Sequence, residues 1–185
     1  MGNTGRLNLF HRVSNTLHMS GGFSMKLMIK EKKISIRDSF TVKDEYGNDR
    51  YQVVGEFLET SKKLHIKDMQ GNEVASIREK KISLKPKFYL YIRDEKVGEI
   101  VKDRAMIGDK YHITGLDWKI KGNDAYHDYK IVKEGRKIAE IRKKCLAMTD
   151  TYVLDIENAV EEIPALAAIL AINYMAAEEE DEEEN

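Results

Sequence analysis

A repeat of about 24 residues runs through the middle of this 185-residue chain and limits the folds that it can adopt. Similar strand-like segments open at intervals of 24, 24 and 23 residues, at Phe40, Leu64, Phe88 and Tyr111. Turn signals come next, at Gly47-Asn48, Gly71-Asn72 and the Asp94-Glu95 region, with another at Glu134-Gly135, and each precedes a second strand-like run. Tight turns join antiparallel strands, so each repeat predicts a β-hairpin. A leucine-rich solenoid would need a regular leucine framework, which this chain lacks.

Within the hairpins, apolar and polar side chains alternate with period two, as in "FTVKDEYGNDRYQVV". This pattern is typical of strands that bury one face and expose the other. The side chains predicted to face inward in the first two repeats are Phe40, Val42, Leu64 and Ile66. Those predicted to face outward are Thr41, Lys43, His65 and Lys67. The fold class expected is mainly β: about twelve short strands in an antiparallel closed barrel, because closure removes the exposed edges of the sheet.

The C-terminal part carries an apolar stretch from Ile163 to Ala177 in which Asn173 is the only strongly polar side chain. Its alanines and leucines, with Pro164 near the first turn, predict a helix over about 162–177. The apolar stretch would be about 22 Å long, too short for a bilayer core of about 30 Å. A helix that is apolar all round is normally enclosed by protein, and a twelve-stranded barrel is too wide for its own side chains to fill. We therefore expect the helix to be the central plug of the barrel, with hydrogen-bond partners for Asn173 inside it.

Three regions follow from these patterns. Residues 1–24 lack the apolar core of a secretion signal and are expected to be a disordered leader or a vector-derived remnant, with Met25 as the native start. Residues 25–177 are expected to form the barrel and its helix. Residues 178–185 are expected to be a disordered acidic tail, whose seven acids leave residues 1–177 with a charge of about +6 although the whole chain carries −1.

Several segments resemble one known family. The run "MKLMIKEKKISIRDSFTVKDEYGNDRYQVVG", then "LHIKDMQGNEVASIREKKISLKPKFYLYI", "DWKIKG", "KIAEIRKK" and "TDTYVLDI" are similar in kind and order to the LURP-one-related family. The resemblance covers Met25 to about Ala177. It implies the fold shared with the tubby C-terminal domain and the phospholipid scramblases, in which twelve strands wrap around a hydrophobic C-terminal helix. Two departures stand out: Cys145, Leu146 and Met148 where the family often has aromatic residues, and Asn173 where an aspartate is common.

No sequence motif of an enzyme is found. The chain lacks a hydrolase elbow, a phosphate-binding loop, a dinucleotide fingerprint, zinc-ligand spacing and a metalloprotease helix, so we expect a protein that is not an enzyme and has no cofactor. The histidines are scattered and are interpreted as surface residues: His11, His18, His65, His112 and His127. The single cysteine, Cys145, is interpreted as a buried, inert thiol, and it allows no internal disulfide. A cytoplasmic location is expected.

The candidate ligand-binding residues lie on "KPKFYLYIR". Alternation puts Lys85, Lys87, Tyr89, Tyr91 and Arg93 on one strand face, while Phe88, Leu90 and Ile92 face the core. Cations beside interfacial tyrosines are suited to anionic phospholipid headgroups at a membrane surface, and tubby-like relatives bind phosphoinositides. The competing interpretation is a solvated strand face whose tyrosines serve β-propensity.

The sequence also raises the question of partners other than lipid. A protein-interaction barrel is the alternative, with the acidic tail as a docking or autoinhibitory element. Calcium is suggested by four acids that precede the helix, Asp155, Glu157, Glu161 and Glu162. Their spacing does not match the twelve-residue calcium-binding loop, so no metal site is predicted. Nucleic acid is not expected, because no basic and aromatic stacking platform is visible.

Overall fold

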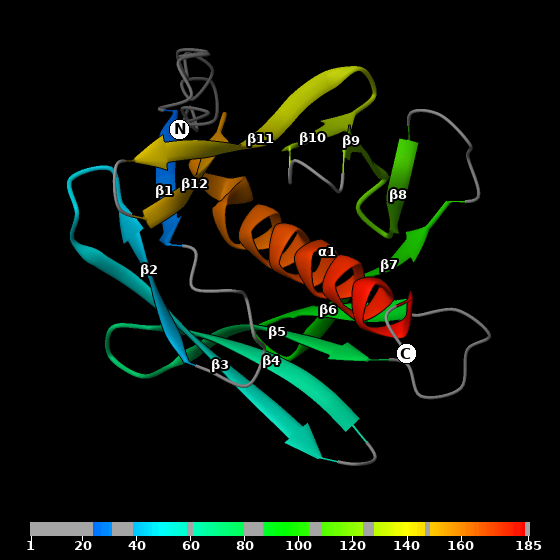
Figure 1. Cartoon of the computed structure of the whole chain (residues 1–185), viewed down its shortest axis with the longest axis horizontal. Coiled ribbons are helices and arrows are strands. Elements are labelled where there is room, and N and C mark those ends of the chain that lie inside the picture. Colours follow the sequence, from blue (N-terminus) through cyan, green and yellow to red (C-terminus); the bar gives the residue numbers. More distant parts are fainter. Residues whose placement is uncertain are drawn as a thin grey trace, which may run out of the picture.

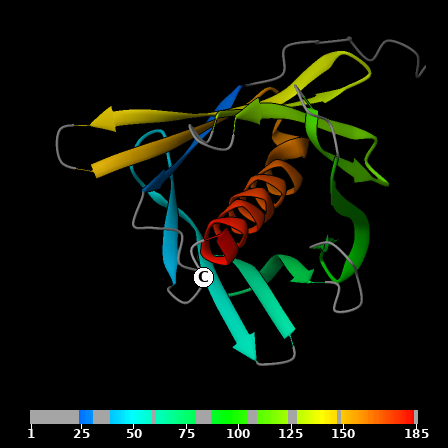
Figure 2. The same ribbon diagram turned by 45° about the vertical axis from the view of Figure 1, so that its right-hand side comes forward.

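Twelve antiparallel strands form a closed barrel around one helix, as the sequence predicted (Figures 1 and 2). The computed structural model describes residues 24–30, 39–58, 61–79, 87–103, 109–123, 128–146 and 149–183. Each strand pairs with the next along the chain, and β1 pairs with β12 to close the barrel. The leader predicted for residues 1–24 lies outside the described residues apart from Ser24.

The strands are β1 (Met25–Lys30), β2 (Phe40–Asp44), β3 (Asp49–Leu58), β4 (Ser61–Asp68), β5 (Glu73–Glu79), β6 (Lys87–Ile92), β7 (Glu95–Lys102), β8 (Asp109–Thr114), β9 (Trp118–Asn123), β10 (Asp128–Lys133), β11 (Arg136–Leu146) and β12 (Thr149–Ile156). A 3₁₀ turn, η2 (Ala159–Glu161), leads from β12 into the helix α1 (Glu162–Glu183).

The first two hairpin turns have the same structure, which accounts for the repeat. In the β2–β3 turn, Oδ1 of Asp44 accepts hydrogen bonds from two backbone N–H groups, those of Tyr46 at 2.9 Å and Asn48 at 2.8 Å. Asp68 accepts the equivalent bonds from the backbone N–H groups of Gln70 and Asn72 in the β4–β5 turn. The glycine of each turn has φ +87°, in the left-handed region that favours glycine.

Later turns are tighter. Arg93 and Asp94 join β6 to β7 with φ 47° and 66°, and Glu134 and Gly135 join β10 to β11 with φ 49° and 80°. Two successive positive φ values match the hairpin turn whose twist agrees with that of the flanking strands. Arg93 is therefore a turn residue, one position earlier than the turn predicted at Asp94-Glu95.

The predicted inward and outward faces are confirmed. Val42, Leu64 and Ile66 are buried, and Phe40 packs against the same core, whereas the four side chains predicted to face outward are only partly buried. On β6 the inward set is also as expected, with Phe88 and Leu90 buried and Ile92 packed against the core.

Helix α1 runs through the inside of the barrel, with strands around it (Figure 2). The side chains from Ala165 to Met175 are all 5% exposed or less. The ring of Tyr174 meets that of Phe88 edge-on, with centroids 5.0 Å apart, so the helix is held against β6 near its C-terminal end. Burial of large aliphatic side chains such as Ile169 and Leu170 contributes about 1.5–3 kcal/mol each.

Two features of α1 differ from expectation. The helix runs to Glu183, beyond the expected residue 177 and into the segment expected to be disordered, because glutamate favours helix and no glycine or proline interrupts the run. Within the barrel, Asn173 is buried, yet neither its Oδ1 nor its Nδ2 has a hydrogen-bond partner among the described residues. The expected inward partners are therefore not found there.

No helix in the described part of the chain combines the length and apolarity needed to cross a membrane.

Candidate ligand-binding face of the barrel

The outward side of β6 and its two neighbours carries the predicted binding residues. Lys87 and the two tyrosines point away from the core, and the outward residues of β5 and β7 lie beside them. We call this surface the β5–β7 face; it comprises Ser76, Arg78, Lys87, Tyr89, Tyr91, Lys96 and Glu99.

Each tyrosine of the β5–β7 face supports a cation from a neighbouring strand. The guanidinium of Arg78 lies 4.0 Å from the ring centroid of Tyr91, and Nζ of Lys96 lies 3.6 Å from that of Tyr89. Both contacts are diagonal, because Arg78 is directly opposite Tyr89 and Lys96 is directly opposite Tyr91. A cation over an aromatic face gains about 0.5–1 kcal/mol at exposed sites, so the rings hold these two charges in place.

Carboxylates offset only part of this charge. Glu99 is shared by two lysines, with Oε1 3.4 Å from Nζ of Lys87 and Oε2 3.9 Å from Nζ of Lys96. Arg78 donates from Nε to Oγ of Ser76 at 3.2 Å and from Nη2 to Oδ1 of Asp94 at 3.4 Å. Because Asp94 is largely exposed and its contact with Arg78 is long, the guanidinium of Arg78 remains able to bind a competing anion.

Three of the five predicted residues are brought together by the fold. Lys87, Tyr89 and Tyr91 are half-buried neighbours on the β5–β7 face. Arg93 is not on this face, because its left-handed backbone ends the strand and turns the chain toward β7. Lys85 lies outside the described residues.

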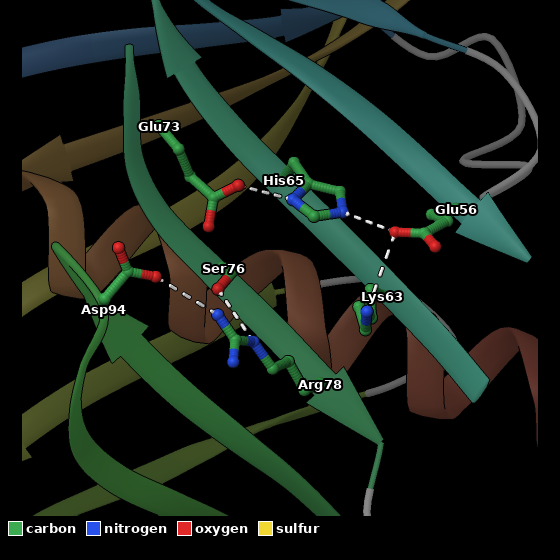
Figure 3. A network of polar contacts seen from close by, with 7 residues as sticks. All are labelled: Glu56, Lys63, His65, Glu73, Ser76, Arg78 and Asp94. Carbon is green, nitrogen blue, oxygen red and sulfur yellow. Dashed lines mark hydrogen bonds and ion pairs between the residues drawn. The ribbon is translucent and has the colours of Figure 1, made fainter.

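A second polar cluster adjoins the face across β5 (Figure 3). His65 on β4 lies directly opposite Ser76, and its ring nitrogens meet two carboxylates: Nδ1 is 2.5 Å from Glu73 and Nε2 is 3.1 Å from Glu56. The hydrogen bond from His65 and the charge of Lys63, 3.8 Å away, lower the pKa of Glu56. The cluster sets two carboxylates, those of Glu56 and Glu73, against Lys63 and a histidine that is charged only when protonated, so it adds no excess of positive charge beside the β5–β7 face.

Arg78 and Lys96 were missed by sequence reasoning. Alternation in "EVASIRE" places Ser76 and Arg78 on the polar side of a strand, which was a usable signal for Arg78. Lys96 had no such signal, because a bulge opposite Leu90 and Tyr91 shifts the β6–β7 register and determines which lysine reaches the ring of Tyr89.

The acids before the helix are held separately. Glu157 pairs with Lys137 at 2.6 Å, Glu161 with Arg136 at 3.0 Å and Glu162 with Arg50 at 3.1 Å; Asp155 accepts a hydrogen bond from Ser24 at 2.8 Å. No group of three or more histidine, cysteine or acidic side chains that could hold a metal occurs among the described residues.

Among the remaining histidines and the single cysteine, the structure describes the side chain of His112 alone. His112 points outward on β8 and its Nδ1 lies 2.6 Å from Oδ1 of Asp103. Cys145 belongs to β11, but its side chain lies outside the described part. His11, His18 and His127 also fall outside it.

Comparison with known proteins agrees with the resemblance seen in the sequence. The sequence model of the LURP-one-related family matches residues 25–173 of the chain. The chain is 28% identical over 159 residues to "Uncharacterized protein YxjI" of Bacillus subtilis (strain 168), an alignment that covers 85% of this chain and 98% of the relative. The X-ray structure of the Arabidopsis thaliana protein AT5G01750 superposes with a TM-score of 0.59 at 15% identity, covering 81% of this chain and 91% of that one, and so supports the fold alone.

Proposed function

The chain belongs to the LURP-one-related family, and on this premise we propose that it is a non-enzymatic barrel that binds anionic phospholipid headgroups at a membrane surface through the β5–β7 face. The observation that carries the proposal is the pair of cations, Arg78 and Lys96, each held on a tyrosine ring. Lys87 adds a third cation beside them.

The chemistry of the face suits a phosphate-bearing headgroup. A guanidinium presents several N–H donors in a fixed plane, which matches phosphate oxygens, while an ammonium acts as a point charge. Because one carboxylate serves two lysines, an incoming phosphate meets unneutralised positive charge. The half-buried tyrosines are amphipathic and are suited to the polar boundary of a bilayer.

The role we propose is peripheral. The protein would reside in the cytoplasm and attach reversibly to anionic membranes, with neither a catalytic residue nor a cofactor. Attachment through exposed charges weakens as salt rises, because the screening length shortens to about 8 Å at physiological ionic strength.

Co-sedimentation of the full chain with vesicles tests the proposal. Neutral phosphatidylcholine vesicles are compared with vesicles that also contain phosphatidylserine or a phosphoinositide, at low and moderate salt. The test variant combines Arg78→Glu, Lys87→Glu and Lys96→Glu. The control combines Lys119→Glu, Lys130→Glu and Lys144→Glu, which change three exposed lysines on β9, β10 and β11 by the same total charge.

We expect salt-sensitive binding to anionic vesicles that the test variant loses and the control keeps. Loss in both variants equally would indicate a response to net charge only and would contradict the assignment to this face. If the unmodified chain binds no vesicle, the lipid role is wrong and a protein partner becomes the leading alternative.

A further inference from the structure

Two cavities flank η2 at the end of the barrel where the tight turns lie. The larger, about 720 Å³, lies between η2, the start of α1 and the turns after β2, β4 and β6. Its apolar lining includes Met69, Val74, Ile92, Val97, Ile163 and Pro164. The smaller, about 460 Å³, is lined on the other side of η2 by residues that include Leu116, Trp118, Glu161 and Arg136. Val160 and Pro164 border both.

An exposed apolar side chain stands between the cavities. Val160 is 83% exposed although it borders apolar groups on both sides. Met69, on the rim of the larger cavity, is also exposed. A hollow apolar surface with exposed aliphatic groups at its centre is suited to receiving apolar side chains.

The smaller cavity is balanced in charge, with Lys133 and Arg136 against Glu134 and Glu161, so the preference for a cationic occupant rests on the larger cavity and on one oxygen of Glu161. The lining of the larger cavity includes three carboxylates, on Asp49, Asp68 and Glu95, against two arginines. Of these groups, Arg50 is bound to the buried Glu162 and Asp49 is bound to Lys43, which leaves Asp68 and Glu95 against Arg93. In the smaller cavity, Oε2 of Glu161 is buried without a hydrogen-bond donor among the described residues, while Oε1 accepts from Arg136. A buried acceptor of this kind is stabilised by an added N–H donor.

The N-terminal segment of this chain enters at the same end of the barrel. Met25 pairs with Ile156, the last residue of β12, only a few positions before η2. Ser24 is anchored beside it, since its hydroxyl donates to Asp155. The point at which residues 1–23 join the described chain is therefore at this end of the barrel, and residues 1–23 lie outside the family match, which starts at residue 25.

The composition of this segment complements the cavities. Residues 1–24 contain no acid, and "RLNLFHRV" at residues 6–13 combines two arginines and a histidine with two leucines, a phenylalanine and a valine. Ser24 follows Phe10 by fourteen positions, a stretch that can span up to about 46 Å, more than the length of about 33 Å of the central helix. Reach is therefore sufficient for docking within one molecule.

We propose that residues 6–13 of this chain dock in the cavities beside η2, with their apolar side chains packed around Val160 and an arginine directed at the carboxylate of Glu161. This contact is independent of the β5–β7 face. It assigns a binding surface and an occupant to the turn end of the barrel.

Paramagnetic labelling of the full chain tests the proposal. A nitroxide is attached through Asn8→Cys in a Cys145→Ala background, so that only one thiol reacts. NMR signals of the Trp118 indole N–H and of the Ile163 and Leu116 methyl groups are compared before and after reduction of the nitroxide. Trp118 is the only tryptophan of the chain, so its signal is unambiguous. Val101, at the opposite end of the barrel, is the distant reference.

We expect the signals beside η2 to be lost while the nitroxide is active and the Val101 signals to remain. Val160→Lys should restore the lost signals, because it adds a cation to the docking surface. Tyr46→Lys is the matched control: Tyr46 is 82% exposed in the β2–β3 turn and is absent from both cavity linings, so signal loss should persist.

Three results would overturn the proposal. The first is that signals beside η2 survive with the nitroxide active. The second is signal loss that Val160→Lys leaves unchanged, which would indicate non-specific contact. The third is signal loss that disappears on dilution, which would assign the occupant to a second copy of the chain.

Discussion

Glu162, at the start of the central helix, accepts two hydrogen bonds from the guanidinium of Arg50 on β3, with Nε–Oε1 and Nη2–Oε2 distances of 3.1 and 3.3 Å. The carboxylate is buried and the guanidinium is about half exposed. This hydrogen bonding raises the pKa of Arg50, and burial, together with the charge of Glu162, raises the pKa of the neighbouring Tyr51. The helix is thus fixed to the barrel wall at one end by a charged pair and at the other by the aromatic contact of Tyr174 with Phe88.

Removing the arginine should therefore destabilise the fold. Arg50→Gln leaves a buried carboxylate without its cation, and we expect a loss of about 1–2 kcal/mol in the free energy of unfolding, discounted for the exposure of Arg50. Arg136→Gln breaks the pair with Glu161 and is the control; its guanidinium is more exposed, so a smaller loss is expected. Urea denaturation of both variants measures the difference, and equal losses would contradict a special role for Arg50.

The buried amide of Asn173 should cost stability. Asn173→Leu replaces two polar atoms that lack partners among the described residues by apolar atoms of similar volume, so we expect a gain of about 1–3 kcal/mol in the free energy of unfolding. Asn173→Ala removes the same polar atoms but leaves a cavity, and its gain should be smaller. Thermal unfolding distinguishes the two. A loss of stability in the leucine variant would mean that the amide has a partner, such as a buried water.

Stability should fall in acid through the two related turns. Hydrogen bonds from the side chain and backbone of Asn48 lower the pKa of Asp44, and those from Asn72 lower the pKa of Asp68. Between the lowered pKa and the ordinary value of about 3.9, the unfolded chain binds more protons than the folded chain. The stabilisation is therefore complete above the ordinary value and is lost as pH falls through the folded pKa.

Substitution at one of these turns tests the pH effect. Asp68→Asn should flatten the decline of the unfolding free energy below about pH 4, because the titrating group is gone. Urea denaturation at several pH values provides the comparison, with Asp117→Asn in the β8–β9 turn as control. A decline that is the same in all three proteins would exclude Asp68 as a source of the acid sensitivity.

Gly122 on β9 has no space for a side chain. A Cβ placed there would lie 2.1 Å from the carbonyl oxygen of Asp128 and 2.9 Å from Cα of Tyr129, so backbone atoms would have to move. We expect Gly122→Ala to destabilise the barrel by about 1–3 kcal/mol. Gly135→Ala meets no atom within 4 Å and loses only the preference of its φ of +80° for glycine, about 1 kcal/mol. Equal effects by chemical denaturation would show that β9 and β10 separate without cost.

The acidic end of α1 should oppose membrane binding. Residues 178–185 carry seven negative charges and no positive charge. A chain that ends at Ala177 should therefore bind phosphatidylserine vesicles more tightly than the full chain at low salt, and the difference should shrink at high salt. Neutral vesicles are the control. Unchanged binding after truncation would exclude autoinhibition by the tail.

The architecture of the barrel could be predicted from the sequence. The spacing of Phe40, Leu64 and Phe88 predicted the hairpins, alternation predicted which side chains face inward, and the uniform apolarity from Ile163 to Ala177 predicted an enclosed helix. These features are local or periodic, so the chemistry of neighbouring residues is enough to read them. The extent of α1 was underestimated, because a run of like charges indicates solvation but does not prevent glutamates from continuing a helix.

The composition of the β5–β7 face, in contrast, depends on how the strands pair in three dimensions. Cross-strand register and the bulge opposite Leu90 and Tyr91 bring Arg78 and Lys96 onto the two tyrosines, and neither depends on residues that are adjacent in sequence. The left-handed turn at Arg93 removes that residue from the face although its parity fits. Contacts between strands depend on register, and register is fixed when the whole barrel closes around its helix, a step that no single strand encodes.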